Sequence, residues 1–250
     1  MSHRLLTDEQ EKYVSQQYTI GRNMQSLATE FNTNKTTIKN ILRRNRIIAR
    51  PKKRISSLNH DVFDIPCEER SYWIGFLLAD GCVLDASNRL PAVQLSLSVK
   101  DANHINKFAN FCHLSIPVTP SKISFSSEKI VKQLATWNII PRKSGREIIP
   151  NEFATNRDFW RGVIDGDGWI SKPYTIGVSG SFKVCLSFCE LALNICGSKI
   201  SPLKIKNKEC WQTVIHGPKA LTMMRFLYEG STISLERKQT KVDQLLGLNA

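Results

Sequence analysis

No apolar run in this 250-residue sequence approaches the roughly 18 to 20 residues that a membrane span needs. The N-terminus, Met1-Ser2-His3-Arg4, also lacks the apolar core of a secretory signal. The seven cysteines include no Cys-x-x-Cys pair, which argues against both a disulfide framework and a zinc ribbon. We therefore expect an intracellular globular protein with no membrane partner, located in the cytoplasm or nucleoid, or in an organelle if it is encoded there.

Positive charge is in clear excess. The formal net charge is +13, and residues 1–54 hold twelve Lys or Arg against four Asp or Glu. Such a balance favours a polyanionic partner, of which nucleic acid is the commonest. Charge alone does not separate DNA, RNA and anionic lipid.

The first fifty residues show the pattern of three short helices. Thr7 followed by Gln10 is a capping-box start, and apolar residues at helical spacing predict two further helices at about 24–31 and 35–44. A turn at 32–34 comes directly before the basic last helix. This is the helix-turn-helix pattern, in which the last helix can enter the major groove, although any small three-helix bundle with a charged face would show the same features.

The segment LATEFNTNKTTIKNILRRN resembles the helix-turn-helix of DNA invertases and resolvases. We therefore expect a DNA-binding domain at 1–50 and a basic linker at 51–65 that can track phosphates. The residues expected to contact DNA from these two segments are Lys35, Thr36, Lys39, Arg43, Arg44, Lys52, Lys53 and Arg54.

From about residue 66 the pattern changes to helices mixed with alternating strands, clearest at 93–99. The same order of elements then repeats, which predicts two halves, 66–153 and 154–250, related by a pseudo-twofold axis like that of a DNA duplex. In the first half we expect a helix up to Asp80, a strand at 93–99, a helix at 102–112, a strand at 122–126 and a helix at 127–137. In the second half we expect a helix at 157–167, strands near 169–181, a helix at 183–196, strands at 203–206 and 211–215, and helices at 218–228 and 234–246.

Two segments, WIGFLLADG at 73–81 and WRGVIDGDG at 160–168, anchor the repeat with a constant offset of 87 residues. Trp73 matches Trp160, and Gly75 matches Gly162. Each segment ends in Asp-Gly, and its interior is apolar apart from Arg161 and Asp165 in the second copy.

Small residues four positions apart give each of these helices a face along which another backbone can approach, so we expect the two helices to pack together. Each then ends in a carboxylate, Asp80 or Asp167, next to the negative end of the helix dipole. Two adjacent carboxylates also repel each other, so the arrangement requires a cation, and oxygen ligands close to a phosphate suit Mg²⁺. Alone, either aspartate could be an ordinary turn residue, but two matched copies argue against that interpretation.

The paired motifs resemble the LAGLIDADG homing endonucleases in their single-chain, two-motif form, over about residues 66–250. The resemblance implies an α+β fold of two αββαββα halves, preceded here by the helix-turn-helix domain. It also implies a monomer that cuts double-stranded DNA with Mg²⁺, for which Mn²⁺ can substitute, Asp80 and Asp167 each binding metal and cutting one strand. The motif copies depart from the family pattern in their leading Trp and in Arg161.

Family members also tend to carry a basic residue in each active site. Lys143 in IIPRKS and Lys238 in SLERKQT occupy similar late positions in their halves and look like these catalytic lysines, although surface lysines are common in a protein this basic. Lys100 and Ser181, at the ends of matching strands, are looser candidates for a further polar catalytic position.

The polar faces of the predicted strands are the expected DNA-reading surface, since Gln and Ser can read base edges and Lys can neutralise phosphates. An ordinary solvated sheet face would look similar. The residues expected there are Gln94, Ser96, Ser98, Lys100, Lys122, Ser124, Ser179, Ser181, Lys204, Lys206, Lys208 and Gln212.

Two alternatives stay open. One is an RNA maturase that assists intron splicing, with intron RNA as the partner, since proteins of this family can bind structured RNA. The other is a non-catalytic DNA-binding regulator in which the helix-turn-helix dominates. The intact pair Asp80 and Asp167 counts against the second.

Overall fold

The computed structural model describes residues 6–48, 57–85, 90–114 and 119–248. The chain divides into two compact units, residues 1–55 and 56–250. The basic part of the linker expected at 51–65, which holds Lys52, Lys53 and Arg54, lies outside the described residues. Among the described helices, none is long and apolar enough to cross a bilayer.

The first unit consists of α1 (Asp8–Thr19), α2 (Met24–Glu30) and α3 (Lys35–Arg44), as the sequence predicts. Thr7 caps α1 with the expected capping box. The apolar faces of the helices form a separate small core around Val14, Leu27 and Ile38. Because the Arg44 guanidinium pairs with the nearly buried Glu11, this arginine also serves the unit's own packing.

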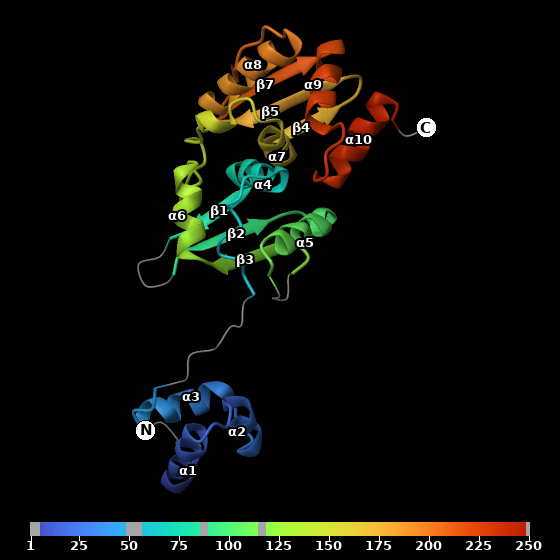
Figure 1. Cartoon of the computed structure of the whole chain (residues 1–250). Helices are drawn as coiled ribbons and strands as arrows, with labels where there is room; N and C mark the ends of the chain where they lie inside the picture. The colour runs from blue at the N-terminus through green and yellow to red at the C-terminus, as the bar shows by residue number, and fades with distance from the viewer. Residues whose placement is uncertain (1–5, 49–56, 86–89, 115–118, 249–250) are drawn as a thin grey trace. The chain divides into compact units, whose positions relative to one another are not determined.

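The second unit holds two antiparallel sheets with the helices α4 and α7 between them (Figure 1). One sheet has the order β1-β2-β3 and the other the order β4-β5-β7-β6. The elements of its first half are α4 (Glu68–Ala79), β1 (Gly81–Leu84), β2 (Ala92–Ser96), η1 (Val99–Asp101), α5 (Ala102–Phe111), β3 (Lys122–Ser126) and α6 (Glu128–Thr136). After the short η2 (Asn151–Phe153), the second half has α7 (Arg157–Asp167), β4 (Gly168–Ser171), β5 (Thr175–Gly180), α8 (Phe182–Cys196), β6 (Leu203–Lys204), β7 (Trp211–His216), α9 (Pro218–Tyr228) and α10 (Glu236–Leu246).

The α+β fold with two similar halves is confirmed, but the halves differ in detail. The second half follows the αββαββα order and adds α10. In the described residues the first half has one strand fewer, since only an isolated bridge between Thr119 and Lys122 precedes β3.

One predicted strand was too long. Alternation continues in the sequence to Val99, yet β2 ends at Ser96. The Ser98 hydroxyl accepts from the backbone N–H of Lys100 and starts η1, so the chain turns and Val99 is exposed. Apolar alternation therefore marks a face only while the backbone stays extended.

Both sheets bury one face against helices. Val93 and Leu95 of β2 and Ile176 and Val178 of β5 point into a single core that runs through both halves. The other face of each sheet carries the more polar side chains. This arrangement brings the carboxyl ends of α4 and α7 together between the sheets.

Candidate active site

The helices α4 and α7 cross with their backbones almost in contact. A Cβ atom placed on Gly75 would lie 2.0 Å from the carbonyl oxygen of Phe159, and one placed on Gly162 would lie 2.1 Å from that of Tyr72. Only glycine leaves room for this approach. The predicted packing of the two motif helices is confirmed.

This crossing brings the two acidic tips side by side. Asp80 caps α4, and Asp167 ends α7. A Cβ placed on Gly166, the residue before Asp167, would lie 3.5 Å from Asp80 Oδ2 and 2.4 Å from the Ala79 Cβ. Each tip leads directly into the first strand of its half, so the pair lies where both open sheet faces begin.

The electrostatics of the tips reflect this proximity. Burial, followed by the charge of Asp80, raises the pKa of Asp167 to about 6, while Lys143 opposes the shift. Burial also raises the pKa of Asp80, against the charges of Lys238 and then Lys143. Asp80 is exposed and Asp167 is half-buried, so both carboxylates are crowded by protein yet reach solvent.

The pair fits a divalent cation by the chemistry of its donors. Two hard carboxylate oxygens that repel each other gain from a shared positive charge, and after burial the charge of Asp80 is the next cause of the raised pKa of Asp167. The described residues contain no cluster of three or more His, Cys, Asp or Glu side chains able to hold a metal. Mg²⁺ suits such a site, because it commonly keeps several waters and takes its remaining oxygen ligands from one or two carboxylates and a phosphate.

Lys143 lies at the carboxyl end of α4. Its side chain is buried, and its Nζ donates to the Ala79 carbonyl over 2.7 Å. Burial lowers its pKa, which the nearby charges of Asp167, Glu147 and Asp80 partly offset. Since one carbonyl takes only one of the three ammonium protons, donors are left for a substrate oxygen.

Lys238 occupies the matching place beside α7, but all its donors are used. Its Nζ donates to the carbonyls of Ile164 at 2.5 Å, Asp165 at 2.8 Å and Gly168 at 2.7 Å. Burial lowers its pKa to about 8, and the charge of Asp165 is the largest effect in the opposite direction. The matching sequence positions of Lys143 and Lys238 thus predicted that both lie near the acidic tips. The difference in their hydrogen bonding was not predictable, because it depends on the loop that carries Lys143 and the helix that carries Lys238.

Asp165, a polar residue inside the second motif copy, is fully buried beneath the tips. Its carboxylate accepts from the Tyr72 hydroxyl at 2.8 Å, the Tyr228 hydroxyl at 2.7 Å and the backbone N–H of Leu235 at 2.6 Å. These partners come from both halves. In the sequence, the only signal for this network is that Asp165 is a charged residue in a largely apolar helix segment. Its partners lie 63 to 93 residues away, so no local pattern identifies them.

The open face of the first sheet carries the expected polar residues. In the strand register, Gln94 lies opposite Ser124, and Ser96 lies opposite Lys122. These four side chains therefore share the face opposite the core. Their contact with DNA stays a prediction.

The second sheet differs from the expected pattern. Leu203, and not Lys204, lies opposite Gln212 in the register, so Lys204 points to the other side. Lys206 and Lys208 lie in the turn between β6 and β7. The misplacement of Lys204 arose because β6 has only two residues, too few to define an alternation.

Two serines of the second half are already engaged by the protein. Ser181 is buried as the N-cap of α8, and its hydroxyl donates to the Glu147 carbonyl at 2.6 Å. The Ser179 hydroxyl donates to the Asp167 carbonyl at 3.1 Å. Ser181 is therefore not on the open face as predicted, because its hydroxyl holds the helix start in place.

Trp169 is a surface residue that sequence reasoning missed. It follows Asp167 by two positions, and its indole ring lies against Gly177, where a Cβ would come within 2.4 Å of the ring. The register places both residues on the open face of the second sheet. An aromatic ring therefore adjoins the acidic tips.

No protein-family model matches this chain, and no curated protein matches it in sequence. Among solved structures, it is similar to full-length DUF199/WhiA from Thermatoga maritima, with a TM-score of 0.47 and 16% identity over 76% of this chain and 65% of that one. The match thus spans less than two thirds of that protein's length.

The chain is also similar to two homing endonucleases solved with DNA. The first is I-WcaI bound to its DNA recognition sequence, with a TM-score of 0.48 and 13% identity over 78% of this chain and 89% of that one. The second is the I-LtrWI LAGLIDADG homing endonuclease bound to target DNA, with a TM-score of 0.46 and 11% identity over 76% and 91% of the two chains. At these identities the similarity concerns the fold alone.

Proposed function

We propose that this chain is a metal-dependent DNA endonuclease that hydrolyses one phosphodiester bond on each strand of a duplex. The observation that carries the proposal is the pairing of Asp80 and Asp167 at the ends of two tightly packed helices. Their position between two open sheet faces gives a duplex a surface on which both strands can pass the acidic tips.

The residues of this chain have distinct tasks in such a reaction. Asp80 and Asp167 hold the divalent cation, which when bound supplies a more acidic water and neutralises charge on the leaving oxygen. Lys143 is placed to stabilise charge on the phosphate through its free N–H groups. Lys238 fixes the end of α7 and adds positive charge beside Asp80.

DNA is the proposed substrate because positive charge and paired open faces occur together. The chain carries a net charge of +13, and the open face of the first sheet combines Lys122 with Gln94 and two serines. Lysines neutralise phosphates, and amide or hydroxyl side chains can read base edges. The solved I-WcaI and I-LtrWI structures each hold DNA on a similar fold.

The experiment incubates the purified full chain with a library of DNA duplexes and Mg²⁺ and sequences the cut ends. Asp80→Asn and Asp167→Asn are compared with Glu190→Gln, an exposed carboxylate on α8 outside the site. We expect wild type and Glu190→Gln to cut both strands, each aspartate variant to nick one strand, and the double variant or a chelator to abolish cutting.

Two outcomes would replace this proposal. Sequence-specific DNA binding without cleavage in Mg²⁺ or Mn²⁺ would identify a DNA-binding regulator. Tight binding of structured intron RNA, again without DNA cleavage, would identify a maturase. Equal cutting by wild type and the double aspartate variant would show that the tips are not the catalytic groups.

A further inference from the structure

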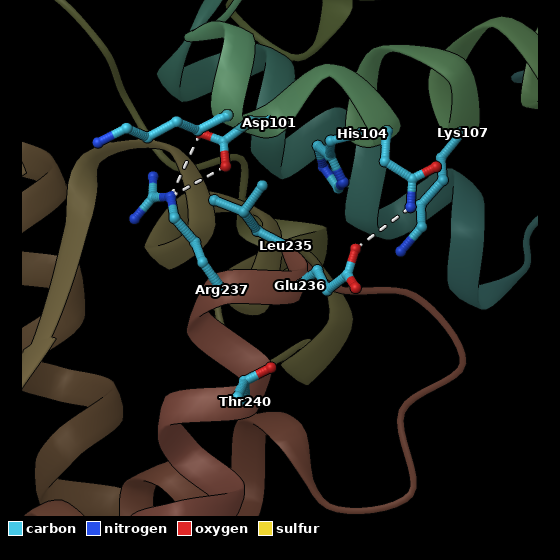
Figure 2. Close-up of a pocket in the computed structure, with 9 residues that line it drawn as sticks. Asp101, His104, Lys107, Leu235, Glu236, Arg237 and Thr240 are labelled. Atoms are coloured by element: carbon cyan, nitrogen blue, oxygen red, sulfur yellow. Dashed lines mark hydrogen bonds and ion pairs between the residues drawn. The ribbon is translucent and has the colours of Figure 1, made fainter.

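A pocket of about 460 Å³ opens where the two halves of the larger unit meet. One wall is η1 and the start of α5, from the first half, and the other is the start of α10, from the second (Figure 2). None of the pocket residues was used in the proposed catalytic step. The pocket is also polar, with side chains of both charges.

Arg237 is held rigidly on one wall. Its Nε donates to both carboxylate oxygens of Asp101, at 3.0 and 3.2 Å, and the Asp101 side chain is almost buried (Figure 2). In the described part of the chain the two terminal nitrogens of Arg237 have no hydrogen-bond or ion-pair partner. A guanidinium fixed through Nε with both other nitrogens free is prepared for a planar or tetrahedral oxyanion.

The remaining charges leave the pocket rim positive. Three cations, Lys100, Lys107 and Arg237, line the pocket against two carboxylates, Asp101 and Glu236. Asp101 pairs with Arg237, and the Glu236 carboxylate accepts from Asn103 Nδ2 at 3.2 Å. Lys107 donates to the Ser234 carbonyl at 3.3 Å. Lys100, on the wall opposite Arg237, is exposed, and within the described residues its ammonium has no such partner.

The floor of the pocket is neutral. His104 is buried there among aromatic rings, and its Nε2 lies 2.9 Å from the Tyr72 hydroxyl. Because that hydroxyl gives its only proton to Asp165, the histidine must donate from Nε2, which leaves Nδ1 as a bare acceptor. Burial, followed by the positive charge of Lys107, lowers the His104 pKa to about 3. The floor therefore offers no positive charge, and the cations Lys100 and Arg237 lie at the rim.

The rim also lies close to the candidate catalytic pair. Arg237 precedes Lys238, whose Nζ donates at 2.7 Å to the carbonyl of Gly168, the residue that follows Asp167. A polymer strand that passes this pair can thus reach the rim with a neighbouring phosphate. In the first half, Arg142 precedes Lys143 as Arg237 precedes Lys238, but Arg142 has a left-handed backbone with φ 55° and, among the described residues, no ion pair comparable to that of Arg237 with Asp101.

We propose that Arg237 and Lys100 bind one phosphodiester of the DNA backbone at the rim of this pocket, near the acidic tips, and that Asp101 positions Arg237 for that contact. The proposal rests on DNA being the substrate of the proposed function. It makes the footprint on DNA asymmetric, because the matching position of the pseudo-symmetric pair, Arg142, lacks such an ion pair among the described residues.

The test measures duplex affinity of the full chain at several salt concentrations without divalent metal, so that binding is separate from cutting. The variants are Arg237→Ala, Lys100→Ala and Asp101→Asn. Lys132→Ala, which removes an exposed lysine from α6, controls for the loss of one charge. Thermal unfolding of each variant checks that it is folded.

We expect Arg237→Ala and Lys100→Ala each to weaken binding about 5- to 10-fold and to reduce the slope of log affinity against log salt by about 1. Asp101→Asn should weaken binding about 3-fold and keep the slope, because the cation remains but is less ordered. Lys132→Ala should leave both quantities near wild type. Wild-type affinity and slope in folded Arg237→Ala and Lys100→Ala proteins would overturn the proposal.

Two further arms identify the source of the phosphate and separate this proposal from catalysis. Inorganic phosphate, at ionic strength matched with chloride, should compete with DNA only weakly. If phosphate instead raises the thermal stability of wild type but not of Arg237→Ala, and Arg237→Ala leaves DNA affinity unchanged, the pocket binds free phosphate and the DNA proposal is wrong. A wild type that never cuts DNA but shows the predicted slopes would support the phosphate subsite while refuting the endonuclease. A wild type that cuts DNA, with salt slopes unchanged in the variants, would support the endonuclease and refute the phosphate subsite.

Discussion

Arg161 of α7 donates through Nη2 to Glu68 Oε1 of α4 at 2.8 Å, which ties the second motif helix to the first turn of the first. The guanidinium is fully buried. Its other bonds go to Asp158 and to the carbonyls of Leu227 and Ile233. The departure from the family pattern at Arg161 is thus a buried link between the two halves.

Replacing this arginine should cost much stability. Arg161→Met removes a buried charge and takes one donor each from Glu68, Asp158 and the carbonyls of Leu227 and Ile233, although Glu68 keeps the Thr232 N–H and Asp158 keeps Arg157. We expect the free energy of unfolding to fall by about 3 to 5 kcal/mol. Urea denaturation followed by circular dichroism measures it. Arg157→Met, one turn earlier and half-buried, should cost about 1 kcal/mol or less; equal effects of the two variants would contradict the assigned role of Arg161.

The glycines at the helix crossing give a prediction whose sign opposes ordinary helix propensity. On an open helix surface, Gly→Ala stabilises by about 1 kcal/mol. Because a Cβ on Gly75 or Gly162 would overlap a carbonyl of the other helix, we expect each alanine to destabilise by about 3 kcal/mol. Thermal and urea unfolding both report this.

The same substitution elsewhere is the control. Gly197 ends α8 in a left-handed conformation, φ 60°, with open space around it, so Gly197→Ala should cost only about 1 kcal/mol of backbone strain. If all three alanine variants had similar stability, the crossing would be looser than described.

The glycines at the helix crossing and the buried polar residues Arg161 and Asp165 show what the sequence can and cannot predict. The glycine spacing of 73–81 and 160–168 is a local periodicity, so the helix faces and their contact followed from it. The roles of Arg161 and Asp165 depend on partners more than sixty residues away, which no periodicity within a helix encodes. The sequence marked both as exceptions but supplied no partner for either.

Strand faces were predictable in proportion to strand length. The face shared by Gln94, Ser96, Lys122 and Ser124 was correctly grouped, since β2 and β3 each have five residues of alternation. In the two-residue β6 the face of Lys204 was wrong.

The raised pKa of Asp167 makes stability depend on pH. The pKa of Asp167 is about 6 in the folded protein and ordinarily 3.8, so the native state binds this proton more tightly than the unfolded state does. The native protein therefore loses stability as pH rises from 3.8 to about 6. Asp167→Asn should therefore be more stable than wild type above pH 6, by about 1 to 2 kcal/mol after allowance for partial exposure. The advantage should vanish near pH 4.

Divalent metal supplies the check on this explanation. If the loss of stability at high pH arises from repulsion between the adjacent Asp80 and Asp167 carboxylates, added Mg²⁺ should stabilise wild type at pH 8 and have little effect on Asp167→Asn. Urea unfolding between about pH 4 and 8, with and without Mg²⁺, measures both effects. A wild type and variant whose stabilities run parallel across this range would show that Asp167 titrates normally.

The two buried lysines should differ in what their loss does to the fold. Lys238 gives all three protons to carbonyls of the α7 end, so Lys238→Met should lower the free energy of unfolding by about 2 to 4 kcal/mol. Lys143 makes one such bond, and Lys143→Met should cost about 1 kcal/mol. Equal losses in urea unfolding would contradict the difference in bonding.

Their effects on cutting should separate by strand. Among the lysines, Lys238 lowers the pKa of Asp80 most and Lys143 lowers the pKa of Asp167 most, so we expect each lysine to support the aspartate of the other half. We expect Lys143→Met and Asp167→Asn to protect the same strand, and Lys238→Met and Asp80→Asn to protect the other. Lys143→Met should slow its strand about 100-fold, and Lys238→Met should slow its strand less, because carbonyls already take all three Lys238 protons. A duplex labelled separately on its two strands measures both rates at once. If either lysine variant slowed the two strands equally, the pairing across the halves would be wrong, and each lysine would act on the centre as a whole.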